Sequence, residues 1–126
     1  MNILAIDFGS KHIGLAKGDD QNKIALPFLS LENNGLNKLI NDLKEIVKNE
    51  NIEEIVVGLP LNMSGQKTDQ TKKTEYFAER LGKEINIKII LEDERLTSFG
   101  AKKLGSDVDE HQLAAREILQ GYLDKN

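Results

Sequence analysis

The sequence predicts an α/β fold with one mixed sheet and helices on both of its faces, and three observations support this. Three short apolar runs follow one another closely at the N-terminus, which is typical of an antiparallel meander. After them, helical periodicity alternates with short apolar runs, as in crossover units. Such crossovers are right-handed, so the later strands should lie parallel to the first strand. The expected order is βββαβαβα.

The meander is expected from residues 2–7, 12–18 and 23–31. The first segment is a short apolar run, and the second alternates between larger and smaller side chains. Pro27 lies within the third segment, and a proline cannot donate a ladder hydrogen bond. The third strand is therefore expected at an edge of the sheet or with a bulge.

The first helix is expected over residues 36–47, because apolar residues recur there at helical spacing. These residues are Leu36, Leu39, Ile40, Leu43 and Val47. The segment EEIVVGL at residues 53–59, which is apolar after its first two residues, then predicts a buried strand. Residues 60–65 follow it as a loop.

The second half of the chain continues the alternation. A polar helix is expected over residues 67–82, with Gly82 as its C-terminal cap. The last strand is expected at residues 85–93. A short helix near 98–104 and a final helix over about 110–124 complete the order.

Length and composition indicate a single domain over residues 1–126, because the chain has a mass of 14.1 kDa. It is 39% hydrophobic and 30% charged, and no run of roughly 18 apolar residues predicts a membrane span. The N-terminus does not resemble a signal peptide, so a cytoplasmic location is expected. The absence of cysteine excludes disulfides and thiol chemistry. A net charge of −4 argues against a protein that only coats nucleic acid, because such domains are usually basic.

Acidic residues follow the first and the last strand. Asp7 ends the first apolar run, and Glu92, Asp93, Glu94 and Arg95 end the last one. Because open α/β sheets bind ligands at the carboxyl ends of their strands, these acids are candidates for a common site. Two structural alternatives remain, since Asp7 could cap a turn and Arg95 could pair with a neighbouring acid.

Carboxylates brought together in one site repel each other and raise each other's pKa unless a cation neutralises them. Oxygen ligands suit Mg²⁺ or Mn²⁺, which hold phosphates and stabilise the leaving oxygen of a displacement. Hydrolysis of phosphodiester bonds is therefore the reaction that the pattern favours.

Four segments extend this interpretation. They are AIDFGSKHIGLA (5–16), VVGLPLNMSG (56–65), EDERLTS (92–98) and LAAREILQGYL (113–123). In this order they resemble the YqgF family, also called RuvX, of Holliday junction resolvases or pre-16S rRNA nucleases, which is related to RuvC. The resemblance covers nearly the whole chain and implies an RNase H-like fold, whose βββαβαβα order agrees with the one expected from periodicity.

The resemblance implies a nuclease that uses Mg²⁺ or Mn²⁺. The catalytic and metal-binding acids of the family correspond to Asp7 and Glu94. The third position usually holds an aspartate, three residues before the first alanine of the last helix, and here it holds His111. His12 likewise stands where an arginine is usual.

The residues around His111 have separate expected roles. At 100° per residue, His111 lies within about 40° of the buried stripe of its helix, so it faces the sheet as a third ligand or as a core histidine. Asp109 fits an N-cap with Gln112 three residues on, and metal contact is its second role. Glu110 lies at the edge of the buried face, and Asp107 is expected in a loop.

Four residues are candidates for substrate contact. Lys11 and Arg95 would attract phosphates, Asn62 lies in the expected loop, and Thr97 either contacts substrate or caps a helix. The lysines that follow the loop alternate with acids, which favours a solvated helix face. The aromatic residues occupy core-like positions, so no stacking platform for bases is predicted.

The expected partner is structured RNA or branched DNA, with no membrane, and the protein is expected as a monomer or a homodimer. One alternative is a module that binds RNA or DNA junctions but is catalytically impaired by the change at position 111. The other is an actin-like nucleotide-binding domain, because residues 5–16 also resemble the phosphate-binding hairpin of that group. Cleavage assays and nucleotide titration distinguish these alternatives.

Overall fold

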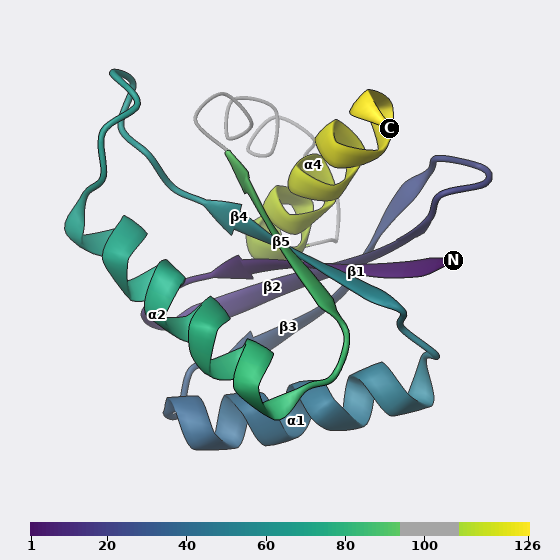
Figure 1. Cartoon of the computed structure of the whole chain (residues 1–126), viewed down its shortest axis with the longest axis horizontal. Coiled ribbons are helices and arrows are strands. Elements are labelled where there is room, and N and C mark those ends of the chain that lie inside the picture. The colour runs from purple at the N-terminus through teal and green to yellow at the C-terminus, as the bar shows by residue number, and fades with distance from the viewer. Residues whose placement is uncertain (94–108) are drawn as a thin grey trace.

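The computed structural model describes residues 1–93 and 109–126, which form a mixed five-stranded sheet in the order β3-β2-β1-β4-β5 (Figure 1). The strands are β1 (Asn2–Phe8), β2 (His12–Asp19), β3 (Ala25–Glu32), β4 (Glu54–Leu59) and β5 (Lys88–Asp93). β2 is antiparallel to β1 and β3, whereas β4 is parallel to β1 and β5. The expected meander and parallel strands are confirmed, although β5 begins later than residue 85.

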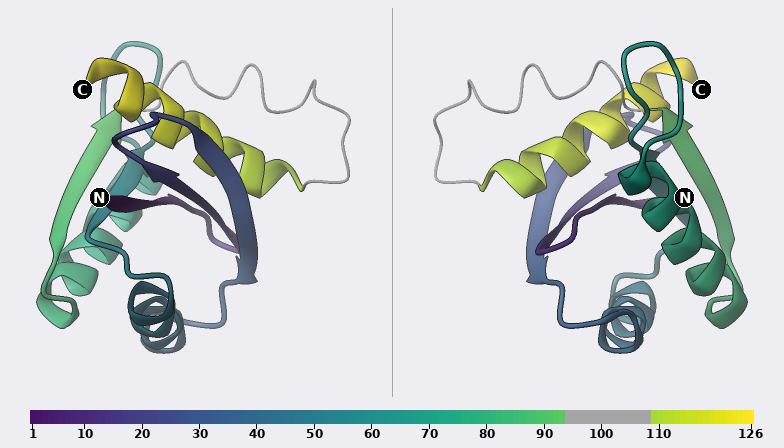
Figure 2. Two further views of the ribbon diagram at one scale, coloured as in Figure 1. Left: turned by 90° about the vertical axis from the view of Figure 1, so that its right-hand side faces the viewer. Right: turned by 90° about the vertical axis from the view of Figure 1, so that its left-hand side faces the viewer.

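Helices cover both faces of the sheet, as expected (Figure 2). α1 (Leu36–Asn49) and α2 (Asp69–Glu84) cover one face, and α4 (Glu110–Lys125) covers the other. Side chains of β1 alternate between the two cores, so Leu4 and Ile6 face α1 and α2 while Ile3 and Ala5 face α4. The helix expected near 98–104 lies outside the described residues. Among the described helices, none has the length and apolarity to span a membrane.

The proline in β3 has the expected consequence. β3 is an edge strand, and its register against β2 shifts between Leu15, which pairs with Leu29, and Ala16, which pairs with Pro27. The irregularity accommodates a residue that cannot donate a ladder hydrogen bond. Both parts of the prediction for Pro27 are therefore confirmed.

The expected bounds of the helix over residues 67–82 were wrong at both ends. α2 begins after Thr68, whose hydroxyl accepts a hydrogen bond from the amide of Thr71 at 3.3 Å. The hydroxyl of Thr71 in turn accepts from the amide of Thr68 at 2.9 Å, which completes a capping box. At the other end the helix continues through Gly82, and Ile85 in extended conformation is the C-cap. A glycine is tolerated within a helix when packing supports the turn around it.

A row of small residues on one face of β2 lets α4 approach the sheet closely. Gly14, Ala16 and Gly18 alternate along one face of the strand. A Cβ at Gly14 would lie 1.8 Å from the backbone oxygen of His111, and one at Gly18 would lie 2.9 Å from Leu119 Cδ2. Since Gly14 pairs with Asp7 across β1 and β2, the first turn of α4 is held beside the end of β1.

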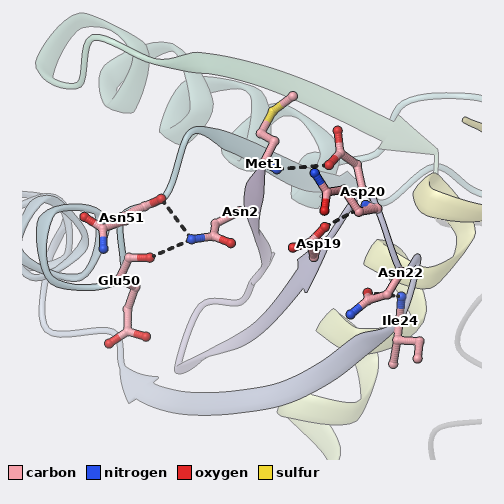
Figure 3. A network of polar contacts seen from close by, with 9 residues as sticks. Met1, Asn2, Asp19, Asp20, Asn22, Ile24, Glu50 and Asn51 are labelled. Carbon is pink, nitrogen blue, oxygen red and sulfur yellow. Dashed lines mark hydrogen bonds and ion pairs between the residues drawn. The ribbon is translucent and has the colours of Figure 1, made fainter.

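At the opposite end of the sheet, a polar network fixes the start of β1 (Figure 3). The N-terminal amine lies 3.1 Å from Asp20 Oδ1, and Asn2 Nδ2 donates to the backbone oxygen of Glu50 at 3.4 Å. A pocket of about 310 Å³ lies there, and Lys17 on its wall forms an ion pair with Glu50. These groups bind each other, which indicates a structural role for this end of the sheet.

A buried acid anchors the C-terminal half of α4. Tyr122 Oη donates to Glu54 Oε1 at 2.7 Å, and Glu54 is only 6% exposed. We expect Tyr122→Phe to lower the free energy of unfolding by about 1–3 kcal/mol, because Glu54 loses its donor. Urea denaturation at neutral pH measures the change, with Tyr76→Phe on an exposed ring as the control.

The same pair has a defined pH dependence. Burial, with the hydrogen bond to Glu54, raises the pKa of Tyr122 to about 12 from 10.0. The stabilisation is therefore complete below pH 10.0 and is lost as the pH rises to about 12. The stability difference between the native protein and Tyr122→Phe should shrink over this interval. A difference that stays constant across it would contradict this role of the hydroxyl.

Candidate functional site

Asp7 lies at the carboxyl end of β1, between two residues of the core that faces α1 and α2. Alternation along the strand turns its carboxylate to the α4 side, where it is partly buried. Burial raises the pKa of this carboxyl, and the nearby charge of His111 acts in the opposite direction. In the described part of the chain the carboxylate forms no hydrogen bond, so it does not cap the following turn.

Other side chains hold that turn. Asn33 Nδ2 donates to the backbone oxygen of Gly9 at 2.9 Å, and Gln70 Nε2 donates to that of Phe8 at 3.0 Å. The first bond ties the turn to the end of β3, and the second ties it to α2. The carboxylate of Asp7, which these described side chains leave free, therefore stands on a turn that is held from two sides.

His111 faces the sheet from the first turn of α4, as helical geometry predicts. Its ring stacks on that of His12, with 4.8 Å between ring centroids and 26° between ring planes. Both rings and Asp7 line one pocket of about 460 Å³. The structure thus brings together Asp7, His111 and the second histidine, and the role of His111 as a ligand stays a prediction.

Asp109 is the N-cap of α4, as expected. Its Oδ1 accepts hydrogen bonds from the amides of His111 at 2.7 Å and Gln112 at 3.2 Å. Burial acts to raise the pKa of Asp109, but hydrogen bonds, including these two, lower it below its ordinary value. The cap uses Oδ1 alone, so contact of Asp109 with a metal stays a prediction. Glu110 is the first residue of the helix and is exposed.

The acids of the last strand are described only in part. Glu92 faces α4, where its Oε2 lies 2.8 Å from Lys125 Nζ. Glu94, Arg95 and Thr97 lie outside the described residues, as does Asp107. Within residues 1–93 and 109–126, no three histidine or acidic side chains form a group that could hold a metal ion.

The remaining candidates have different surroundings. Lys11 is exposed in the turn after β1 and lines the pocket of Asp7. Asn62 is engaged within its own loop, since its Oδ1 accepts from the amides of Ser64 at 3.0 Å and Gln66 at 2.9 Å. Contact with substrate stays a prediction for both residues.

Sequence reasoning missed three residues that shape the pocket, namely His12, Gly14 and Gln70. The alternation of small residues along β2 was the signal for Gly14, because it indicates close approach of another element. His12 carried a weaker signal, as one of two departures from the family pattern. No signal in the sequence pointed to Gln70.

The site fits a divalent cation. The carboxylate of Asp7 is partly buried and has no hydrogen-bond partner among residues 1–93 and 109–126. Its ionised form is therefore unfavourable, and a cation beside it would remove that cost. A carboxylate oxygen and an imidazole nitrogen are both established metal ligands. The turn and the pocket leave room for a phosphate next to Lys11.

Comparison with known sequences gives the following matches. Residues 1–125 match the family described as RuvX, Holliday junction resolvase. A protein of Rickettsia akari assigned as a pre-16S rRNA nuclease is 37% identical over 131 residues, covering 97% of this chain and 85% of the relative. A protein of Dictyoglomus turgidum with the same assignment is 38% identical, covering 98% of this chain and 94% of the relative.

Solved structures of similar fold include RuvC of T. thermophilus in complex with a Holliday junction substrate. It superposes with a TM-score of 0.68 at 11% identity and covers 99% of this chain and 94% of its own. The resolvase of Fowlpox virus in complex with Holliday junction DNA has a TM-score of 0.59 at 13% identity, covering 99% of this chain and 98% of its own. At these identities the similarity concerns the fold alone, and it agrees with the expected RNase H-like architecture.

Proposed function

This chain belongs to the RuvX family, and on that premise we propose that Asp7 and His111 hold a divalent cation at a phosphodiester bond of structured nucleic acid. The chain is a nuclease, and the finer assignment concerns how its residues act. The observation that carries the proposal is the carboxylate of Asp7, which is partly buried and unpaired within the described residues, in a pocket that also presents His111.

The roles follow from position and chemistry. Asp7 supplies an anionic oxygen ligand from the end of β1, and Glu94, which follows directly after β5, supplies the second. His111 supplies a nitrogen at the third position. When bound, the cation neutralises charge on the phosphate during hydrolysis. Lys11 attracts a substrate phosphate, and Arg95 and Thr97 are proposed as further substrate contacts.

The third ligand also sets the preferred metal. Mg²⁺ favours oxygen ligands, whereas imidazole favours transition metals, and Mn²⁺ accepts carboxylates as well. A histidine at position 111 therefore favours Mn²⁺ over Mg²⁺. The stack of His111 on His12 fixes the ring beside the pocket and supports this role.

Exchange of this ligand tests the assignment. We expect His111→Asp to keep or raise cleavage with Mg²⁺ and to shift the preference away from Mn²⁺, because a third oxygen ligand is restored. Initial rates with each metal, measured on the native protein and the variant, give the comparison. A marked loss with both metals in a folded variant would show that the imidazole itself is required.

The names of the relatives favour precursor ribosomal RNA as the substrate, and we propose structured RNA first and branched DNA second. The test is cleavage of a hairpin RNA with an unpaired extension and of a four-way DNA junction, each with Mn²⁺ and with a chelator. Light scattering on the same samples distinguishes monomer from homodimer. Tight binding without cleavage under every condition would instead favour the catalytically impaired module.

A further inference from the structure

A second pocket, of about 480 Å³, adjoins the pocket of Asp7 on the side of the sheet that carries α1 and α2. The two pockets share Phe8 and Ser10 at the end of β1. We call the second one the α1–α2 groove, and the walls used below are Phe8, Ser10, Leu36, Lys72, Lys73 and Tyr76. A ligand that fills it would therefore continue directly into the candidate active site.

The apolar part of the groove is rigid. Phe8 stacks on Phe77, with 4.5 Å between ring centroids and 10° between ring planes. Leu36 begins α1 beside it, after Gly35, which has a φ of 105° and could not be replaced by another residue without strain. An apolar surface of this kind favours a flat ligand that gains by leaving water.

Tyr76 offers a flat ring at the groove. It is 54% exposed, so the expectation that the aromatic residues occupy core-like positions was wrong for this residue. Arg80 lies 5.9 Å from the ring centroid, and its Nη2 donates to Asn37 Oδ1 of α1 at 2.9 Å. The ring is thereby supported between two helices.

Two lysines give the groove a positive charge although the whole chain has a net charge of −4. Lys72 and Lys73 are exposed on α2 and form no ion pair within the described residues. Glu75, three residues after Lys72 on the same helix, is engaged elsewhere, since its Oε2 lies 2.9 Å from Lys67 Nζ. Among the described residues that line the groove, none carries a carboxylate.

We propose that the α1–α2 groove binds an unpaired nucleotide segment of the substrate, next to the bond that is cut. A base packs on Tyr76 and Leu36, and the phosphates of the same segment contact Lys72 and Lys73. The bases must be unpaired because only then are their faces available to an aromatic side chain. The inference rests on the proposed function and specifies its substrate as one with a single-stranded flank.

The test measures binding rather than cleavage. Three labelled RNA hairpins are titrated by fluorescence anisotropy in the presence of a chelator: one with an unpaired extension, one whose extension keeps its phosphates but lacks bases, and one without an extension. We expect the native protein to bind the first most tightly and the blunt hairpin most weakly. Equal affinity for the first and the blunt hairpin would overturn the proposal.

Variants separate the two kinds of contact. Tyr76→Ala should weaken binding of the unpaired extension by about 10-fold or more and leave the baseless extension unaffected, whereas Tyr76→Phe should retain affinity. Lys72→Ala and Lys73→Ala should each weaken binding of both hairpins that carry an extension. Each should also reduce the slope of the logarithm of affinity against the logarithm of salt concentration by about 0.7. Lys48→Ala, on the exposed end of α1, is the charge control. Equal effects of Tyr76→Ala on both extensions would overturn the proposal.

The outcome is separable from that of the proposed nuclease activity. Selective binding with loss on Tyr76→Ala, but without cleavage under any metal, supports the groove and refutes the assigned activity. Cleavage that depends on Asp7, with no preference for an unpaired extension, supports the activity and refutes the groove. Thermal unfolding of each variant checks that the fold is kept, since substitution of an exposed side chain should leave the Tm close to that of the native protein.

Discussion

Asp7→Asn is expected to reduce metal-dependent cleavage by more than about 100-fold, because loss of a direct ligand should exceed the 10- to 100-fold effect of outer-shell changes. The substitution keeps the size of the side chain but removes the charge that holds a cation. Initial rates with Mn²⁺ and with Mg²⁺, on structured RNA and on a four-way junction, provide the measurement. Equal activity of the native protein and the variant on all substrates would refute the nuclease assignment for this site.

The same substitution should stabilise the metal-free protein. Since burial raises the pKa of Asp7, ionisation of this carboxyl costs stability. The cost builds up as the pH rises above the unfolded value and is complete above the pKa of the folded state. The cost disappears as the pH falls below the unfolded value, so the native protein and Asp7→Asn should converge in acid. Thermal unfolding in a chelator should thus give a higher Tm for the variant at neutral pH. Added Mn²⁺ should raise the Tm of the native protein more than that of the variant.

Gly14→Ala is expected to be the single change that most disturbs the packing of α4 on β2, which places His111 beside Asp7. The added Cβ would lie 1.8 Å from the backbone oxygen of His111, so the first turn of α4 has to move away from β2. We expect a loss of about 1–3 kcal/mol in the free energy of unfolding, together with reduced cleavage, because His111 moves away from Asp7. Urea denaturation and initial rates measure the two effects.

Gly121→Ala in the same helix is the matched control. Here an added Cβ meets nothing within 4 Å, and an alanine within a helix is favoured over glycine by about 1 kcal/mol. The control should therefore keep or gain stability and keep full activity. If both alanine variants behaved alike, close docking of α4 at Gly14 would not be what positions the site.

The sequence was sufficient for the order of the elements because periodicity reports which face of each element is buried. The apolar run of β1, which is buried on both faces, and the apolar stripe of α1 each need only local information. The end of the helix over residues 67–82 was missed because the packing around Gly82, rather than its intrinsic preference, decides whether the helix continues. The cap at Asp109 was found because it depends on neighbours two and three residues away.

For the candidate site, the sequence predicted which element each residue lies on, but not the contacts between those elements. Asp7 and His111 could be placed on their elements, and the structure brings both to one pocket. The stack of His111 on His12 could not be foreseen, since it depends on how closely α4 lies on β2. The exposure of Tyr76, by contrast, follows from helical spacing, because this residue lies off the buried stripe that includes Phe77 and Leu81.

The two ends of the chain build the pocket together, since Asp7 comes from the first strand and His111 from the last helix. During synthesis, β1 to β4 can form before α4 has left the ribosome, and the pocket is then without one wall. The proposed site is therefore complete only when the last helix docks. If the proposed assignment holds, a nascent or C-terminally truncated chain is expected not to cut the nucleic acid around it.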